Sequence, residues 1–408
     1  MKKDTFIYFY GALQGLYWMS YGCILSFAAV FLLDHGFSNG SIGTLIAVSC
    51  FLSVLLQPLI AAAADKGTRF TVKGAFMLLC FAQIIPFVLL IALKPPTIIV
   101  ALLYSLLILL QLSVQPLLSA LGIQLIQNGV PLNFGVARGI GSLSYSILTF
   151  FLGTLTVVFS TQCLPIISCG LVILILLLLH KFPDMGSPQA VDLVQGGTLA
   201  VLKNNPRFAL LVVGIACIFV SHSALNNYMI HILNRIGKGN EALGQIMAFT
   251  AVLEVPAMLL CTKIIRKWDC GKLLRFTAVF FVLKVVGVTL ASNLTLLYLA
   301  LSFQAISFAP FTAAIVYYVS FALGKHDQVK GQALITIGIT VGNILGSLTG
   351  GYILQYFNVN VMLWLFTAVC IVGMAFFLLG VQNTAFKDLE KPDYVVNVEP
   401  CQMDKNCL

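Results

Sequence analysis

The chain has 408 residues, of which 60% are hydrophobic and 9% are charged, with a formal net charge of +9. An ordinary soluble domain has about 45–50% apolar and about 25% charged residues. So few charges cannot cover the surface of a water-soluble protein, which excludes a cytosolic enzyme, a disordered chain and a nucleic-acid-binding protein. The composition therefore predicts an integral membrane protein whose surface contacts the lipid bilayer.

Twelve apolar segments follow one another along the chain, each of about the length that crosses a membrane as a helix. They are Phe6–Leu33, Gly43–Ala64, Val72–Leu93, Ile98–Ile126, Phe134–Phe159, Leu164–His180, Phe208–Leu233, Leu243–Ile265, Leu273–Ala291, Leu294–Leu323, Gln332–Phe357 and Val361–Val381. The sequence thus predicts an all-α membrane protein with twelve transmembrane helices in two six-helix bundles. The expected parts are an N-terminal bundle (1–182), a cytoplasmic linker (183–207), a C-terminal bundle (208–381) and a cytoplasmic tail (382–408).

Lysine and arginine are distributed unequally among the predicted loops. Of the 23 basic residues, eighteen lie on the side of the termini and three, Lys94, Arg235 and Lys238, lie on the other side. Cytoplasmic loops of membrane proteins carry such an excess of basic residues. We therefore expect a multi-pass protein of the cytoplasmic (inner) membrane with both termini in the cytoplasm. The net positive charge is then a topology signal and requires no nucleic-acid partner.

The two halves of the chain repeat one another weakly. A short basic turn with Asp and Gly follows the second predicted helix at Ala64–Arg69, and another follows the eighth at Arg266–Lys272. A repeated six-helix half is typical of secondary transporters, in which the substrate site lies between the halves near the membrane midplane. The repeat therefore favours a transporter over other polytopic membrane proteins.

Four segments carry a resemblance to a known family. Ile42–Lys66 contains Gln57-Pro58 and Asp65-Lys66, Phe134–Ser142 begins with Phe-Gly-Val-Ala-Arg, and the two shorter segments are Leu253–Pro256 and Leu283–Gly287. These segments resemble the major facilitator superfamily, and within it the branch of lactose permease and related oligosaccharide– and nucleoside–proton symporters. The resemblance implies the major facilitator fold and transport by alternating access.

Glu254 and Lys284 are the acid and the base that lie deepest in the predicted helices. Glu254 lies eleven residues before Ile265, and Lys284 lies eleven residues after Leu273. At about 1.5 Å per residue, both are about 16 Å from the turn between their antiparallel helices, close to the middle of a core about 30 Å thick. We therefore expect the two side chains to meet.

Two interpretations of this pair remain open, because a charge at this depth requires a partner or a cavity. The first is a structural ion pair that locks the C-terminal half. The second is a proton-sensitive carboxylate whose charge is balanced by Lys284 or by the substrate. The family resemblance favours the second, because Glu254 and Lys284 match an acid and an arginine that act in binding and coupling in lactose permease.

Arg138 also lies inside a predicted helix, a few residues from its cytoplasmic end. It could extend to the membrane interface as an ordinary positive-inside residue. The Phe-Gly-x-Ala-Arg resemblance instead implies that Arg138 faces the cavity, where a planar guanidinium binds hydroxyl or carboxylate oxygens bidentately.

The sequence departs from lactose permease at two places. Ser119 or Ala120 stands where the sugar-binding acid of helix four is found, and Gln304 and Ser307 replace the His and Glu of the coupling site in helix ten. Galactoside recognition is therefore not expected. The predicted proton-coupling residues are Glu254, Lys284 and, as a helper, His222.

Neutral polar and aromatic residues repeat at helical spacing on five predicted helices. Gln111, Gln115 and Ser119, for example, are four residues apart and share one helix face. A single such residue is usually an interhelical contact, but five polar faces predict the wall of a cavity. Amides bind hydroxyls, and aromatic faces stack on sugar or base rings. The predicted substrate-binding residues are Arg138, Tyr21, Trp18, Gln57, Gln111, Gln115, Ser119, Asn226, Asn227 and Gln304.

Two other patterns have simpler interpretations. Gly338, Gly342, Gly346 and Gly350 are four residues apart and predict a close contact between helices rather than a nucleotide loop. His222 shares its helix face with no second His or Cys, so no metal site is expected there.

Together these features predict a secondary active transporter that moves a small polar solute, such as a sugar or a nucleoside, by alternating access. The expected mode is symport with protons, with the proton gradient as energy source and no cofactor. The alternatives are an uncoupled facilitator or exporter, and a membrane sensor that binds its ligand without flux. An intramembrane enzyme is disfavoured, because Glu254 has no second acid, catalytic dyad or metal motif near it.

Overall fold

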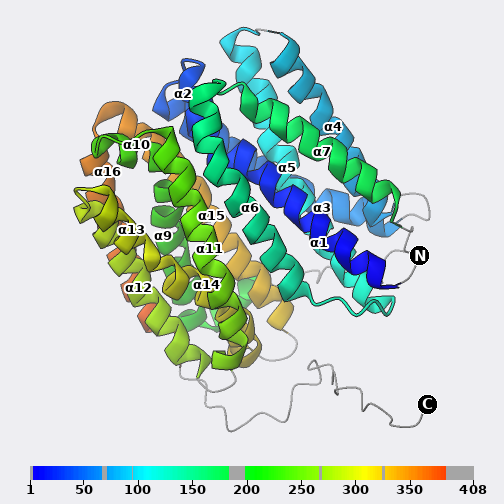
Figure 1. The fold of residues 1–408 in the computed structure, drawn as a ribbon. Coiled ribbons are helices and arrows are strands. Elements are labelled where there is room, and N and C mark those ends of the chain that lie inside the picture. Colours follow the sequence, from blue (N-terminus) through cyan, green and yellow to red (C-terminus); the bar gives the residue numbers. More distant parts are fainter. Residues whose placement is uncertain are drawn as a thin grey trace, which may run out of the picture.

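The computed structural model describes residues 3–66, 71–93, 95–182, 198–265, 269–323 and 327–382, and these residues are almost entirely helical. Two helical bundles lie side by side (Figure 1). The first half of the chain forms α1 (Lys3–Tyr21), η1 (Gly22–Ser26, a π-helical turn), α2 (Ala28–Asp34), α3 (Asn39–Lys66), α4 (Val72–Ala92), α5 (Thr97–Gln127), α6 (Phe134–Val158) and α7 (Cys163–His180).

The second half repeats this arrangement after a short helix, α8 (Thr198–Asn204), which falls in the expected linker. It forms α9 (Pro206–Asn227), α10 (Met229–Arg235), α11 (Asn240–Ile265), α12 (Cys270–Leu290), α13 (Leu294–Ser302), α14 (Gln304–Ala322), α15 (Gln328–Tyr356) and α16 (Val359–Gly380). The rest of the expected linker (183–197) and nearly all of the expected tail (383–408) lie outside the described residues.

Within the described residues, ten helices are long and apolar enough to cross a membrane, or up to eleven with the bent pair Phe6–Ser26 and Ala28–Asp34. The predicted all-α membrane fold is confirmed, whereas the predicted count of twelve is not fully confirmed. Of the twelve predicted segments, the one missing from these eleven is Leu243–Ile265, which forms α11. It has 26 residues and carries Glu254 in its interior.

Three of the predicted continuous segments are interrupted in the structure. The first predicted helix bends by 45° between Ser26 and Ala28. The seventh is divided at Tyr228 into α9 and α10, and the tenth is divided at Phe303 into α13 and α14. Hydropathy alone could not show these breaks, because the residues at them are as apolar as their neighbours.

Short polar side chains start several of the helices. Asn133, Asp269, Asn293 and Asn358 each accept a hydrogen bond from the backbone N–H three residues later, which satisfies one of the free donors at a helix N-terminus. In addition, Gly36 (φ +79°) and Gly237 (φ +70°) occupy the first interhelical turn of each half, in the left-handed conformation that glycine adopts readily.

The glycine stripe of α15 packs against the backbone of α9. A Cβ placed on Gly342 would lie 2.5 Å from the carbonyl oxygen of Ala216, and one on Gly346 would lie 2.2 Å from that of Val220. A real Cβ does not approach another atom so closely, so only glycine permits this contact. The predicted close helix contact is therefore confirmed.

The two halves meet through α6 against α11 and through α3 against α15. We call the face where α1 and α6 begin the proximal face, and the face where α2 and α6 end the distal face. The contacts on the distal side involve backbone: a Cβ on Gly244 would lie 2.4 Å from the Thr149 carbonyl oxygen, and one on Gly43 would lie 2.4 Å from that of Ser347. The halves are thus closed against each other on the distal side.

Candidate functional site

A central cavity of about 690 Å³ lies between the two halves. Helical segments of both halves contribute to its wall, and most of the lining side chains are amides, hydroxyls or aromatic rings. Its lining includes Arg138, the fifth residue of α6, so the cavity extends toward the proximal face. A concave space with convergent polar groups at a domain interface is the usual form of a small-molecule site.

Most of the predicted site residues lie in the wall of this cavity. From the N-terminal half these are Trp18, Tyr21, Gln57, Gln115, Ser119 and Arg138, and from the C-terminal half His222, Asn226, Asn227, Glu254 and Gln304. Two predicted residues are not in the lining. Lys284 lies immediately behind it, and Gln111 lies away from it between α1 and α5.

Gln111 is used for packing. Its amide donates to the Tyr17 carbonyl oxygen at 3.3 Å, and its Oε1 accepts from the Ser20 hydroxyl at 3.5 Å. Its side chain is 1% exposed. The structure therefore does not bring Gln111 to the solute cavity, although it stands only one turn of α5 away from Gln115.

On the N-terminal side, Arg138 stacks over the indole ring of Trp18, with the guanidinium carbon 3.8 Å from the ring centroid. Trp18 is held by a hydrogen bond from its Nε1 to Gln14 Oε1 at 3.2 Å, and its ring lies 5.1 Å from that of Tyr21. No hydrogen bond joins the Arg138 guanidinium to another described residue, so its N–H groups are available to oxygen acceptors in the cavity. The structure thus places Arg138 at the cavity rather than at the membrane interface.

On the C-terminal side, five polar side chains form a continuous hydrogen-bonded chain. Gln304 Nε2 donates to Glu254 Oε1 at 2.9 Å, and Lys284 Nζ donates to Gln304 Oε1 at 2.8 Å. Lys284 Nζ also lies 2.9 Å from His222 Nδ1, and the Asn226 amide lies 3.0 Å from His222 Nε2. We call this set, Glu254–Gln304–Lys284–His222–Asn226, the polar relay.

The expected direct meeting of Glu254 and Lys284 is replaced by a bridge. Gln304, from α14, lies between them, and no ion pair joins the two residues in the described part of the chain. Counting along two helices correctly placed Glu254 and Lys284 near each other, but it could not show that a third helix inserts an amide between the two side chains.

Aromatic rings enclose the basic end of the relay. His222 stacks on Phe308 with ring centroids 5.0 Å apart, and it meets the edge of Phe281 at 6.0 Å. Lys284 is 2% exposed, and its Nζ lies 5.2 Å from the centroid of Phe281. Glu254, Gln304, His222 and Asn226 reach the cavity, whereas Lys284 communicates with it through its neighbours.

Donor and acceptor chemistry allows two self-consistent proton arrangements in the relay. If Lys284 is an ammonium, His222 Nδ1 accepts from it, Nε2 carries the ring proton, and Asn226 must present its oxygen to Nε2. If Asn226 presents its NH₂ group instead, His222 carries its proton on Nδ1 and donates it to a neutral Lys284 amine. The orientation of an amide in the cavity wall is thereby tied to the charge of a buried amine.

Sequence analysis missed one polar face of the cavity, on α15. Thr336, Thr340, Asn343 and Ser347 line the cavity. They recur every three or four residues, so the helical spacing that revealed the other faces was present here too. This polar face lies beside the glycine stripe on the same helix, and both contact α9.

Three comparisons place the chain among known proteins. A model described as the MFS_1 like family matches residues 8–375. The maltose permease of Geobacillus stearothermophilus is 25% identical over 391 residues, which cover 93% of this chain and 94% of the permease. An uncharacterized transporter of Bacillus subtilis, YwbF, is 22% identical over 377 residues, which cover 89% of this chain and 91% of that protein.

Solved structures share the fold at low sequence identity. A point mutant of the nucleoside transporter NupG superposes with a TM-score of 0.78 at 15% identity, covering 91% of this chain and 99% of that structure. A D-xylose–proton symporter superposes with a TM-score of 0.65 at 14% identity, covering 94% of this chain and 98% of that structure.

Proposed function

Because the chain belongs to the MFS_1-like family of the major facilitator superfamily, we propose that it is a secondary transporter of a small polar solute that works by alternating access. The observation that carries this proposal is the central cavity, which is lined by both halves and closed on the distal side by backbone contacts. Rocking of the halves about this cavity would close the proximal side and open the distal side.

The proposed topology follows from the distribution of basic residues. We infer that the protein lies in the inner membrane with both termini in the cytoplasm. The proximal face is then cytoplasmic, and the structure is the inward-facing state. The polar solute then enters from the distal side and leaves through the cavity toward the cytoplasm.

The proposed solute is a sugar or a nucleoside. Amides and hydroxyls of both halves offer donors and acceptors to hydroxyl groups, and the Trp18–Tyr21 cluster offers aromatic faces for stacking. Arg138 adds N–H donors that suit oxygen acceptors on the solute. The names of the relatives, which include a maltose permease, a nucleoside transporter and a xylose–proton symporter, support this class.

Coupling to protons is proposed to run through the polar relay. Glu254 lies in the cavity wall and accepts from Gln304, so loss or gain of its proton changes the bridge to Lys284. At the other end, a solute that turns the Asn226 amide changes which nitrogen of His222 carries the proton. The proton acts on the Lys284 amine through Gln304, and the solute acts on it through His222. The proton gradient is then the only energy source that transport requires.

Reconstituted liposomes test this proposal. A thermal-shift screen of sugars and nucleosides first identifies a solute that stabilises the protein, because specific binding raises apparent stability. Accumulation of that solute is then measured with and without an imposed gradient, acidic on the side from which solute enters. We expect accumulation above equilibrium only with the gradient, and its loss in Glu254→Gln with exchange of solute retained.

Glu241→Gln is the matched control, because Glu241 is an exposed acid in the first turn of the same helix. It should accumulate solute like the unmodified protein. Equilibration that ignores the gradient would establish an uncoupled facilitator instead, and binding without any flux would establish a sensor.

A further inference from the structure

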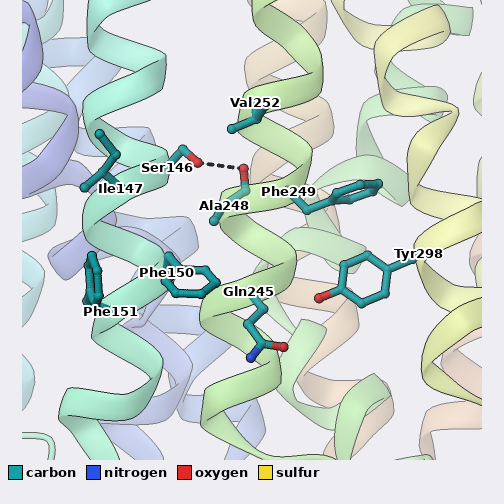
Figure 2. A pocket seen from close by; sticks show the side chains of 9 residues that line it. All are labelled: Ser146, Ile147, Phe150, Phe151, Gln245, Ala248, Phe249, Val252 and Tyr298. Carbon is teal, nitrogen blue, oxygen red and sulfur yellow. Dashed lines mark hydrogen bonds between the residues drawn. The ribbon is translucent and has the colours of Figure 1, made fainter.

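A second, apolar groove opens on the outer surface of the molecule and shares no residue with the central cavity. It has a volume of about 520 Å³ and is formed by both halves of the chain (Figure 2). We call it the lateral groove. Its lining residues are Ser146, Ile147, Phe150 and Phe151 of α6, Gln245, Ala248, Phe249 and Val252 of α11, and Tyr298 of α13.

The lateral groove faces the bilayer. Ile147, Phe150 and Phe151 are each about half exposed, and all three belong to a helix long and apolar enough to span the membrane. Apolar side chains exposed on a membrane-spanning helix are surrounded by lipid acyl chains rather than by water. The molecules available to fill this groove are therefore lipids.

Two polar groups stand at one end of the groove. Figure 2 shows the hydroxyl of Tyr298 directed toward the side chain of Gln245, below the apolar part of the groove formed by Ile147 and Val252. No hydrogen bond joins Gln245 or the Tyr298 hydroxyl to any other described residue, and the ring of Tyr298 is held edge-on by Phe249 at 4.9 Å. Both groups are therefore open to a partner from outside the chain.

The depth of these two groups matches the boundary between acyl chains and headgroups. Gln245 lies five residues after the start of α11, and Tyr298 lies four residues after the start of α13, both on the distal side. At about 1.5 Å per residue, they are roughly 6–8 Å inside the distal ends of their helices. Tyrosine is enriched at this level of membrane proteins.

We propose that the lateral groove binds an acyl chain of a glycerophospholipid from the distal leaflet. The ester carbonyl, which joins the chain to the glycerol, accepts hydrogen bonds from the Gln245 amide and the Tyr298 hydroxyl. The ester offers acceptors and no donors, which complements these two donor groups. The acyl chain then lies along Phe150, Ile147 and Val252, in a space within the range of small-molecule sites.

A lipid bound here would favour the conformation seen in the structure. One wall of the groove belongs to the N-terminal half and the other to the C-terminal half, and the Ser146 hydroxyl donates across them to the Ala248 carbonyl oxygen at 2.9 Å. Opening of the distal side separates these walls, so the lipid binds one state better than the other and shifts the population toward it. This consequence rests on the proposed alternating access, whereas the binding of the lipid does not.

Photolabelling tests the binding step without any transport assay. The probe is a diacyl phosphatidylglycerol with a diazirine in one acyl chain, mixed into liposomes that contain the full-length protein. After illumination, we expect labelled peptides to be concentrated in α6 around 147–151 and in α11 around 245–252. The double variant Gln245→Leu/Tyr298→Phe removes both donors at nearly constant size and should lower this labelling about ten-fold.

Tyr356→Phe is the matched control, because Tyr356 is a strongly exposed tyrosine at the end of α15, away from the groove. It should leave the labelling unchanged. Labelling spread evenly over all exposed helices, or unchanged in the double variant with the same melting temperature, would overturn the proposal. Labelling by a diazirine fatty acid but not by the phospholipid would also overturn it, because the site would then recognise a carboxylate.

Discussion

Replacement of Gln304 by methionine should break the polar relay at its centre. The amide makes two hydrogen bonds, to Glu254 at 2.9 Å and from Lys284 at 2.8 Å, and methionine has nearly the same length but no comparable donor or acceptor. A hydrogen bond to a charged group contributes about 1.5–3 kcal/mol. With Glu254 and Lys284 both ionised, loss of both bonds should therefore destabilise the conformation seen in the structure by about 3 kcal/mol or more.

Gln304→Met should also abolish the coupling of solute transport to the proton gradient. Without the bridge, the protonation of Glu254 no longer changes the surroundings of Lys284, so gradient-driven accumulation should be lost while solute exchange persists. Gln304→Glu keeps an acceptor for Lys284 but faces Glu254 with an oxygen in place of the amide donor, so it should recover stability only where the two carboxyl groups share a proton. The measurements are thermal unfolding in detergent and solute uptake into liposomes with and without a proton gradient.

Gln332→Met serves as the control, because it removes a single neutral hydrogen bond to the Val316 carbonyl oxygen (2.8 Å) on the adjoining helix α14. It should cost no more than about 1 kcal/mol and leave coupling intact. Normal gradient-driven accumulation in Gln304→Met, at unchanged stability, would refute the relay as the route of coupling.

Three further predictions concern the cavity and the frame around it. Gly244→Val should shift the protein away from the distally closed state, because its Cβ would lie 2.4 Å from the Thr149 carbonyl oxygen. Distances between spin labels on the distal ends of α3 and α15 should then lengthen. They should not lengthen in the control Gly170→Ala, where no atom lies within 4 Å of the added Cβ. Arg235→Met should lower the free energy of unfolding by about 2 kcal/mol in denaturant titrations, because Arg235 donates to the carbonyl oxygens of Val288, Thr289 and Ala291 at the end of α12. Arg235→Lys should recover only part of the lost free energy, because lysine lacks the planar donor array. Arg138→Lys should weaken binding of the solute about ten-fold in thermal-shift titrations, because lysine keeps the charge but loses the planar donor array. An unchanged affinity would show that Arg138 does not bind the solute.

Much of the fold was predictable because its signals are local. Apolar length marks the helices, and polar residues such as Asn293 and Asn358 mark where two of them start. The scarcity of intramembrane charge singled out Glu254, Lys284 and Arg138, because each such charge requires a cavity or a partner. The breaks at Tyr228 and Phe303 had no local signal of this kind.

The candidate site was only partly predictable, because helical spacing shows which residues share a face but not what that face meets. Gln111 and Gln115 stand four residues apart, yet one is hydrogen-bonded between α1 and α5 and the other lines the cavity. The polar face of α15, with Thr340 and Asn343, was missed for the same reason. A face becomes a cavity wall only when neighbouring helices leave space in front of it.

The sequence by itself determined that this is a polytopic membrane protein, which side chains lie deep in its helices and which faces are polar, because hydropathy and helical periodicity are properties of consecutive residues. Only the tertiary structure decided how those residues are connected. Gln304 comes between Glu254 and Lys284 because α14 packs against both α11 and α12. The distal closure likewise depends on glycines from opposite halves, whose close approach is set by packing between segments far apart in the chain.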